Sequence, residues 1–229
     1  MQQTTETQPF WRSPRIRTTV ASAKTAGEHE PLQTAEVLRN VKAMRTLKYE
    51  YRDPLEVIWL KAAEDMGMHI QRSDDVFASW NGNGVLHIGG PETLDPDDSL
   101  AQMIFHETCH ALVEGPDALN KPDWGLEIDN PAHRVREHAC LRLQAALAAP
   151  HGLRQFFAAT TNFRRYYDQL PQDPLLDDGD PATPLAHAGS QRLLTGDWAV
   201  PLSNALQRTA AIAAIVKQVA AADSLWSVG

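Results

Sequence analysis

The segment 106–110, which reads His-Glu-Thr-Cys-His, has the residue types and the spacing of a metal site. Residues four apart share one face of a helix, so His106 and His110 can offer two imidazole nitrogens to one metal ion. Glu107 can then point toward a water molecule on that ion and act as a general base. These residues predict a metal-dependent hydrolase site, with His106 and His110 as ligands and Glu107 as the catalytic residue.

Signals on both sides place this segment inside a helix over about residues 99–114. Pro96-Asp97-Asp98-Ser99 supplies start and cap signals, and Gly115-Pro116 supplies a stop. Apolar residues surround the segment on several faces, which is typical of a helix packed inside a domain. Buried histidines and a buried glutamate need polar partners, and a metal ion would provide one. The alternative is that the two histidines are hydrogen-bonded core residues and Glu107 is exposed.

A catalytic zinc site needs one more protein ligand, because such sites keep three ligands and an open position for water. Asn130-Pro131 starts a second predicted helix, which runs to about residue 149 and carries Glu137. Glu137 shares a face with Leu141 and Gln144, so it can reach inward, and it is the preferred third ligand. The other candidates are His138, Glu127, Asp129 and Glu114.

Further residues are candidates for supporting roles at such a site. Glu114 and Asp123 could orient a ligating imidazole. His138, Tyr166 and Tyr167 could stabilise an oxyanion, although aromatic residues more often serve packing.

The regions around the motif helix predict an α+β fold that is mainly helical. Apolar runs over 76–80 and 85–88, joined by Asn81-Gly82-Asn83-Gly84, predict a β-hairpin that leads into the motif helix. Helical spacing predicts further helices over 34–47, 55–68 and 202–222.

Three regions follow from this pattern. They are a flexible tail over 1–32, a metal-binding core over 33–150, and a helical C-terminal region over 151–229 with an Asp/Pro-rich loop at 171–184.

Composition excludes several classes of function. A net charge of −8 and a pI near 5.5 argue against a nucleic-acid partner. Charged residues interrupt the apolar segment 205–222, so it should not span a membrane, and residues 1–31 lack the apolar stretch of a secretory signal.

With two cysteines, Cys109 and Cys140, a cytoplasmic protein is expected. The cysteines are interpreted as packing residues, with a redox switch or a thiolate ligand as alternatives. The oligomeric state is left open.

Residues 76–149, with their hairpin, HExxH motif and Glu-bearing helix, resemble the zincin-like metallopeptidases, most nearly the small gluzincins. The resemblance implies a zincin-like fold, Zn²⁺ held by His106, His110 and Glu137, Glu107 as general base, and a peptide or protein substrate. In zincin-type proteins an edge strand beside the site binds an extended peptide. The sequence departs from gluzincins at Leu141, where they carry an Asp. It is not a metzincin, because Val113 and Pro116 replace the required Gly and His.

The layout is also similar, more distantly, to the bacterial hydroxylase that modifies elongation factor P, which carries an HExxH site and uses iron and oxygen. This second resemblance implies Fe²⁺ and a protein substrate, with Glu107 as a further possible ligand. A third hypothesis is a non-catalytic, metal-bound module whose acidic surface and Asp-rich loop engage a protein partner. The positions that match the hydroxylase are His106, Glu107, His110, Gly115, Asp123, Gly125 and Glu137.

Overall fold

The computed structural model describes residues 48–126, 130 and 132–228. The predicted tail over 1–32 and the predicted helix over 34–47 lie outside these residues. One compact unit contains residues 54–229 and holds all the described helices and strands. Of the other unit, residues 14–53, only residues 48–53 are described, and they form no helix or strand. The predicted boundaries at residues 32 and 150 stay predictions.

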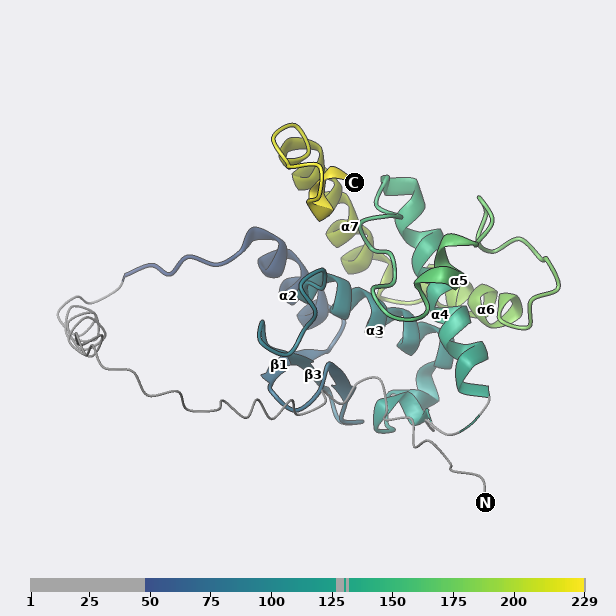
Figure 1. The fold of residues 1–229 in the computed structure, drawn as a ribbon. Helices are drawn as coiled ribbons and strands as arrows, with labels where there is room; N and C mark the ends of the chain where they lie inside the picture. The colour runs from purple at the N-terminus through teal and green to yellow at the C-terminus, as the bar shows by residue number, and fades with distance from the viewer. Residues whose placement is uncertain (1–47, 127–129, 131, 229) are drawn as a thin grey trace, which may run out of the picture. The chain divides into compact units, whose positions relative to one another are not determined.

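The fold is α+β and mainly helical, as predicted (Figure 1). None of the described helices combines the length and the apolar character that crossing a membrane requires. A cytoplasmic location remains a prediction. Along the chain, the helices and strands are α2 (Pro54–Asp65), β1 (His69–Ser73), β2 (Ala78–Trp80), β3 (Val85–Gly89), α3 (Leu100–Glu114), α4 (Ala132–Ala148), α5 (Arg164–Asp168), α6 (Thr183–Thr195) and α7 (Ala199–Val216).

The predicted hairpin is formed by β2 and β3, which pair antiparallel. Its turn is closed by the Asn81 side chain, whose Oδ1 accepts hydrogen bonds from the backbone N–H groups of Asn83 and Val85 at 2.7 and 3.1 Å. Gly82 and Gly84 supply the left-handed backbone that the turn needs, with φ of 74° and 87°. This local chemistry explains why the hairpin could be predicted.

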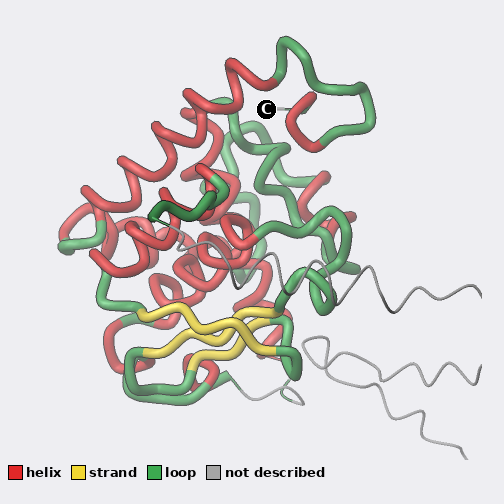
Figure 2. The backbone as a smooth tube through the Cα atoms, turned by 90° about the vertical axis from the view of Figure 1, so that its left-hand side faces the viewer, coloured by secondary structure: helices red, strands yellow, loops and turns green. Residues whose placement is uncertain are grey.

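The sheet itself is mixed, whereas the sequence predicted only a hairpin or small antiparallel sheet beside the motif helix. Its three strands lie in the order β1-β3-β2, and β1 runs parallel to β3 (Figure 2). β1 was not predicted because its sequence, His-Ile-Gln-Arg-Ser, has a single apolar residue and most of its side chains are exposed or half-buried. Its strand conformation comes from pairing with β3, a contact that no local pattern reveals.

The helix that carries the motif, α3, lies in the core of the unit. It begins after Ser99, whose hydroxyl accepts a hydrogen bond from the backbone N–H of Gln102, and it ends at Gly115, where φ is 86°. Twelve of its fifteen residues are buried. Phe105, on its inner side, packs against Trp59 of α2 and Phe157, with ring centroids 5.4 and 4.8 Å away. The predicted buried helix is thus confirmed within one residue.

The Asp/Pro-rich stretch is a loop, as predicted, until α6 begins at Thr183. It is held by Arg142 of α4, a side chain only 2% exposed, which donates hydrogen bonds to Asp178 at 2.5 Å and to the Pro174 carbonyl at 2.8 Å. α5 and α6 were not predicted. At Gly189, a Cβ would lie 2.8 Å from the Leu143 side chain, so α6 packs closely on α4. The buried residues of α6 are Thr183, Ala186, Gly189 and Leu193, of which only Leu193 has a large apolar side chain.

Candidate metal site

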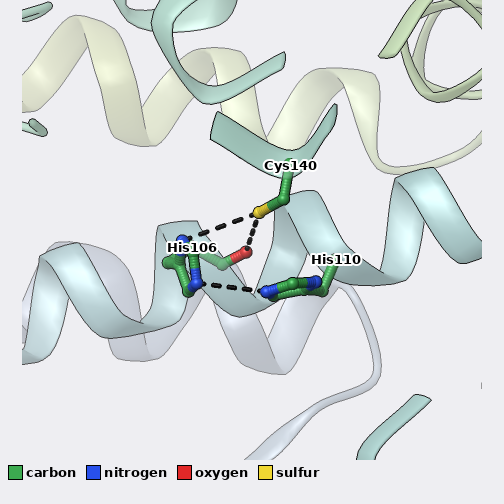
Figure 3. A group of neighbouring side chains, drawn as sticks. All are labelled: His106, His110 and Cys140. Atoms are coloured by element: carbon green, nitrogen blue, oxygen red, sulfur yellow. Dashed lines mark hydrogen bonds between the residues drawn. The ribbon is translucent and has the colours of Figure 1, made fainter. Parts of the chain in front are cut away.

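The two motif histidines present their outer ring nitrogens to each other. His106 Nε2 and His110 Nε2 are 3.1 Å apart, and the two rings are perpendicular (Figure 3). The spacing of four residues on α3 produces this arrangement, as predicted. His110 is almost fully buried, at 4% exposure, and His106 is half-buried. Two imidazole nitrogens therefore face one point at the edge of a pocket.

Glu137 meets these nitrogens from α4. Its Oε1 lies 3.4 Å from His106 Nε2, and its Oε2 lies 3.2 Å from His110 Nε2. The carboxylate is 2% exposed. The packing of α4 on α3 thus brings the preferred third ligand to both histidines.

Cys140 lies on the other side of His106. Its Sγ is 3.6 Å from His106 Nδ1 and donates to the His106 carbonyl oxygen at 3.4 Å (Figure 3). Ligand atoms of His106, His110 and Cys140 all lie within 4.8 Å of one another, so these three residues could also hold a metal ion. Burial raises the pKa of the Cys140 thiol well above its usual value, and the neighbouring Cys109 raises it further. Both cysteines are buried free thiols.

Gln144, two turns after Glu137 on α4, orients His106. Its Oε1 lies 3.0 Å from His106 Nδ1, and its Nε2 donates to the carbonyl of Phe157. That second bond fixes the amide so that its oxygen accepts a hydrogen bond from Nδ1–H, which leaves Nε2 of His106 as the nitrogen with a lone pair. Leu141, which stands where gluzincins have an Asp, lines the pocket instead. The sequence reasoning did not assign Gln144 this role, although its place on the Glu137 face was a signal.

Glu107 is held by Trp124, whose indole Nε1 donates to Glu107 Oε2 at 2.7 Å. Trp124 is itself fixed by stacking on Trp80, with ring centroids 4.6 Å apart. Next to it, Asp123 Oδ1 accepts a hydrogen bond from Ser79 Oγ at 2.8 Å. Asp123 and Trp124 both have left-handed backbone, with φ of 47° and 58°, which is costly outside glycine. The strained backbone persists because residues of β2 hold both side chains, Ser79 by a hydrogen bond and Trp80 by stacking. This conformation brings the Trp124 indole to the Glu107 carboxylate.

A cavity of about 130 Å³ opens beside these residues. Glu107, His106, His110 and Glu137 line it, together with Phe77 and the β2 residues Ala78 and Ser79. Five carboxylic acid residues and three histidines of the described chain line it, whereas none of the described Lys or Arg side chains does. The site therefore combines a candidate metal centre, a carboxylate held beside it, and a space for a ligand.

The remaining candidates lie elsewhere or outside the described residues. His138 stacks on Tyr166, with ring centroids 3.6 Å apart, and neither lines the cavity. The Tyr167 hydroxyl donates to the Arg154 carbonyl, so the contacts of these aromatic residues agree with the packing interpretation. Glu114 pairs with Arg136 instead of bonding a motif histidine. Glu127 and Asp129 lie outside the described residues. Asp123 bonds Ser79 and supports Trp124 rather than an imidazole.

His110 and Glu137 influence each other's protonation in the metal-free protein. Burial disfavours a charge on His110, but the nearby Glu137 carboxylate outweighs burial and raises the pKa of His110 to about 9. Burial likewise opposes the Glu137 charge, but His110 and next His106 lower the pKa of Glu137 to about 2. Without metal, a buried ion pair therefore forms near neutral pH.

This pair predicts the pH dependence of stability without metal. The His110 contribution is complete below its ordinary pKa of 6.5 and is lost as pH rises through about 9. The Glu137 contribution is present above the ordinary pKa of 4.5 and is lost as pH falls through about 2. We expect the unfolding temperature in chelator to fall between pH 6.5 and 9, measured by circular dichroism. Glu137→Gln should flatten this fall; an equally steep fall in that variant would contradict the assignment.

The geometry thus joins two nitrogens and a carboxylate on packed helices, with a second carboxylate held by an indole. Each contact comes from residues far apart in the sequence, apart from the motif itself. Comparison of the chain with models of known protein families, with curated proteins and with solved structures finds no match.

Proposed function

We propose that the protein is a metal-dependent hydrolase with a zincin-like core, and more narrowly a peptidase, with Zn²⁺ held by His106, His110 and Glu137. The observation that carries the proposal is the convergence of two Nε2 atoms and one carboxylate, 3.1 to 3.4 Å apart, on two packed helices. Nearby, Glu107 lines the same cavity, as a general base must.

These donor atoms fit a zinc ion. Nitrogen and oxygen atoms bound at about 2.0–2.1 Å around a tetrahedral ion lie about 3.3–3.4 Å from one another. The two Nε2 atoms are 3.1 Å apart, and each has one oxygen of Glu137 at a similar distance: Oε1 is 3.4 Å from His106 Nε2, and Oε2 is 3.2 Å from His110 Nε2. The Gln144 contact further supports the fit, because it leaves the Nε2 lone pair of His106 available for a metal.

Glu137 suits the third position better than Cys140 does. Cys140 approaches His106 at Nδ1, the nitrogen that already bonds Gln144, whereas His110 and Glu137 approach Nε2. Nε2 of His106 would therefore hold an ion together with His110 and Glu137, whereas the Cys140 sulfur lies beside Nδ1. The raised pKa of the Cys140 thiol also disfavours the thiolate that a metal binds.

Glu107 is the proposed base. A bound zinc ion would supply a Lewis acid and lower the pKa of a coordinated water toward about 7. Trp124 holds Oε2 of Glu107, while Oε1 has no hydrogen bond to any residue that the structure describes. Oε1 is therefore available to accept a proton from the attacking water and to pass it to the leaving amine.

The β2 strand supports a peptide as substrate. β2 is at the edge of the sheet, paired with β3, and Phe77, Ala78 and Ser79 line the cavity. An extended peptide can add to such an edge through backbone hydrogen bonds. This is the role that the zincin resemblance implies for the strand.

The test is the metal content of protein purified without a metal-affinity tag, followed by cleavage of a mixed peptide library. We expect about one zinc ion per chain and cleavage that continues under strict anaerobiosis. Iron with oxygen-dependent turnover would replace the proposal with the hydroxylase, because two histidines and one carboxylate also suit Fe²⁺. Metal-bound protein that neither cleaves peptides nor consumes oxygen would leave the interaction module, and protein that binds no metal would contradict all three hypotheses.

A further inference from the structure

Gln102 is a buried amide without a partner at the wall of the cavity. It lies one turn before His106 on α3, is 5% exposed and lines the cavity. Neither its Nε2 nor its Oε1 has a hydrogen-bond partner in the part of the chain that the structure describes. Buried amides are normally hydrogen-bonded, so this one points to a ligand. The group that matches a side-by-side donor and acceptor is another amide, such as a peptide group.

The same part of the cavity carries carboxylates that the proposed hydrolysis does not use. Asp98 is half-buried; its Oδ1 accepts from the Thr160 hydroxyl at 2.6 Å, and its Oδ2 accepts from the backbone N–H of Asp95 at 3.2 Å. Asp95 and Thr160 also line the cavity. No Lys or Arg side chain of the described residues lines the cavity, so Asp98 and Asp95 favour a cationic group in their part of it.

Apolar side chains complete this region. Met103, Ala158 and Ala159 line the cavity together with Gln102 and Asp98. Lys and Arg side chains have an apolar stem that packs on such surfaces and a charged end that seeks carboxylates. The apolar part of the lining thus suits the stem of a Lys or Arg side chain, and the carboxylates suit its charged end.

We propose that Gln102, Asp98 and Asp95 form a subsite that selects a Lys or Arg residue in the peptide substrate. The Gln102 amide pairs with a backbone peptide group of that substrate, and the two carboxylates accept hydrogen bonds from the ammonium or guanidinium group. This inference rests on the proposed peptidase function and names its substrate class.

The test separates binding from turnover. Capped pentapeptides that differ at the central residue, Lys, Arg, norleucine or Glu, are titrated by calorimetry into the metal-loaded Glu107→Gln variant, which should not cleave them. The Lys and Arg peptides should bind about tenfold more tightly than the norleucine peptide, which has a comparable stem without the charge, and the Glu peptide most weakly.

Two matched variants locate the charge preference. Asp98→Asn keeps an oxygen for Thr160 but loses the charge, and it should reduce the preference for Lys over norleucine to below about threefold. Asp97→Asn removes the same charge from an exposed neighbour that does not line the cavity, and it should leave the preference intact. Gln102→Leu should weaken the binding of the Lys peptide and of the norleucine peptide by the same factor.

Equal affinity for Lys and norleucine, no binding of any peptide, or an unchanged preference in Asp98→Asn would overturn the subsite. Unchanged binding in Gln102→Leu would overturn the assignment of Gln102. The proposed function has a separate readout, which is cleavage of the same peptides by the wild-type protein. Selective binding without cleavage would support the subsite and reject the peptidase function. Cleavage without a charge preference would support the peptidase function and reject the subsite.

Discussion

Glu107→Gln is expected to retain the metal and to lose between about 100-fold and 10,000-fold of the turnover number, the usual contribution of a general base. Gln keeps an oxygen for the Trp124 indole, so the side chain should stay in place. It cannot accept the proton from water, so the chemical step should fail. Metal content by elemental analysis and turnover on a cleaved peptide are measured on the same preparation.

Glu92→Gln is the matched control, because Glu92 is exposed and does not line the cavity. It should keep both metal and activity. Full activity in Glu107→Gln would reject the proposed mechanism. Loss of metal in that variant would instead make Glu107 a ligand, as the iron hydroxylase alternative allows.

Glu137→Gln is expected to weaken metal binding by more than about 100-fold, whereas Cys140→Ser should change it by only a few-fold. Removing a residue that orients a metal ligand typically lowers the metal affinity by about 10- to 100-fold. Removing a ligand itself should therefore lower the affinity by more than that. Glu137 faces Nε2 of both histidines, but Cys140 faces Nδ1 of His106 and the His106 carbonyl. Competition with a chromophoric chelator measures the affinities.

The two substitutions form a matched pair, since both change one buried residue on α4 close to His106. Circular dichroism of each variant checks that the helices persist. The reverse order of effects, with Cys140→Ser losing the metal, would move the third ligand from carboxylate to sulfur. Equal, small effects would contradict a site with either residue as a ligand.

Predictions that depended on local signals were accurate. The Ser99 cap and the Gly115 stop act within one turn, so the limits of α3 followed from the residues themselves. The same holds for the Asn-Gly turn between β2 and β3. By contrast, β1 lacks an apolar alternation and depends on β3 for its conformation, and the buried face of α6 has only one large apolar side chain, Leu193. Both were missed.

The residues of the site divide in the same way. His106 and His110 lie together because helical geometry places them so, and Glu107 follows from the motif. Glu137 could be preferred among five candidates, but its distance from the histidines depends on how α4 packs on α3. Gln144 and Trp124 gained their roles only through contacts 38 and 17 residues away in the chain.

The sequence by itself determined the motif helix, its limits and the two histidines that share one of its faces, because hydrogen bonds and periodicity within a helix are local. The tertiary structure decided which carboxylate meets those histidines, which nitrogen of His106 faces it and which side chain holds Glu107. It also decided that Gln102 and Asp98 line one cavity. These depend on the packing of side chains from different helices and strands, and residue spacing within one segment carries no information about it.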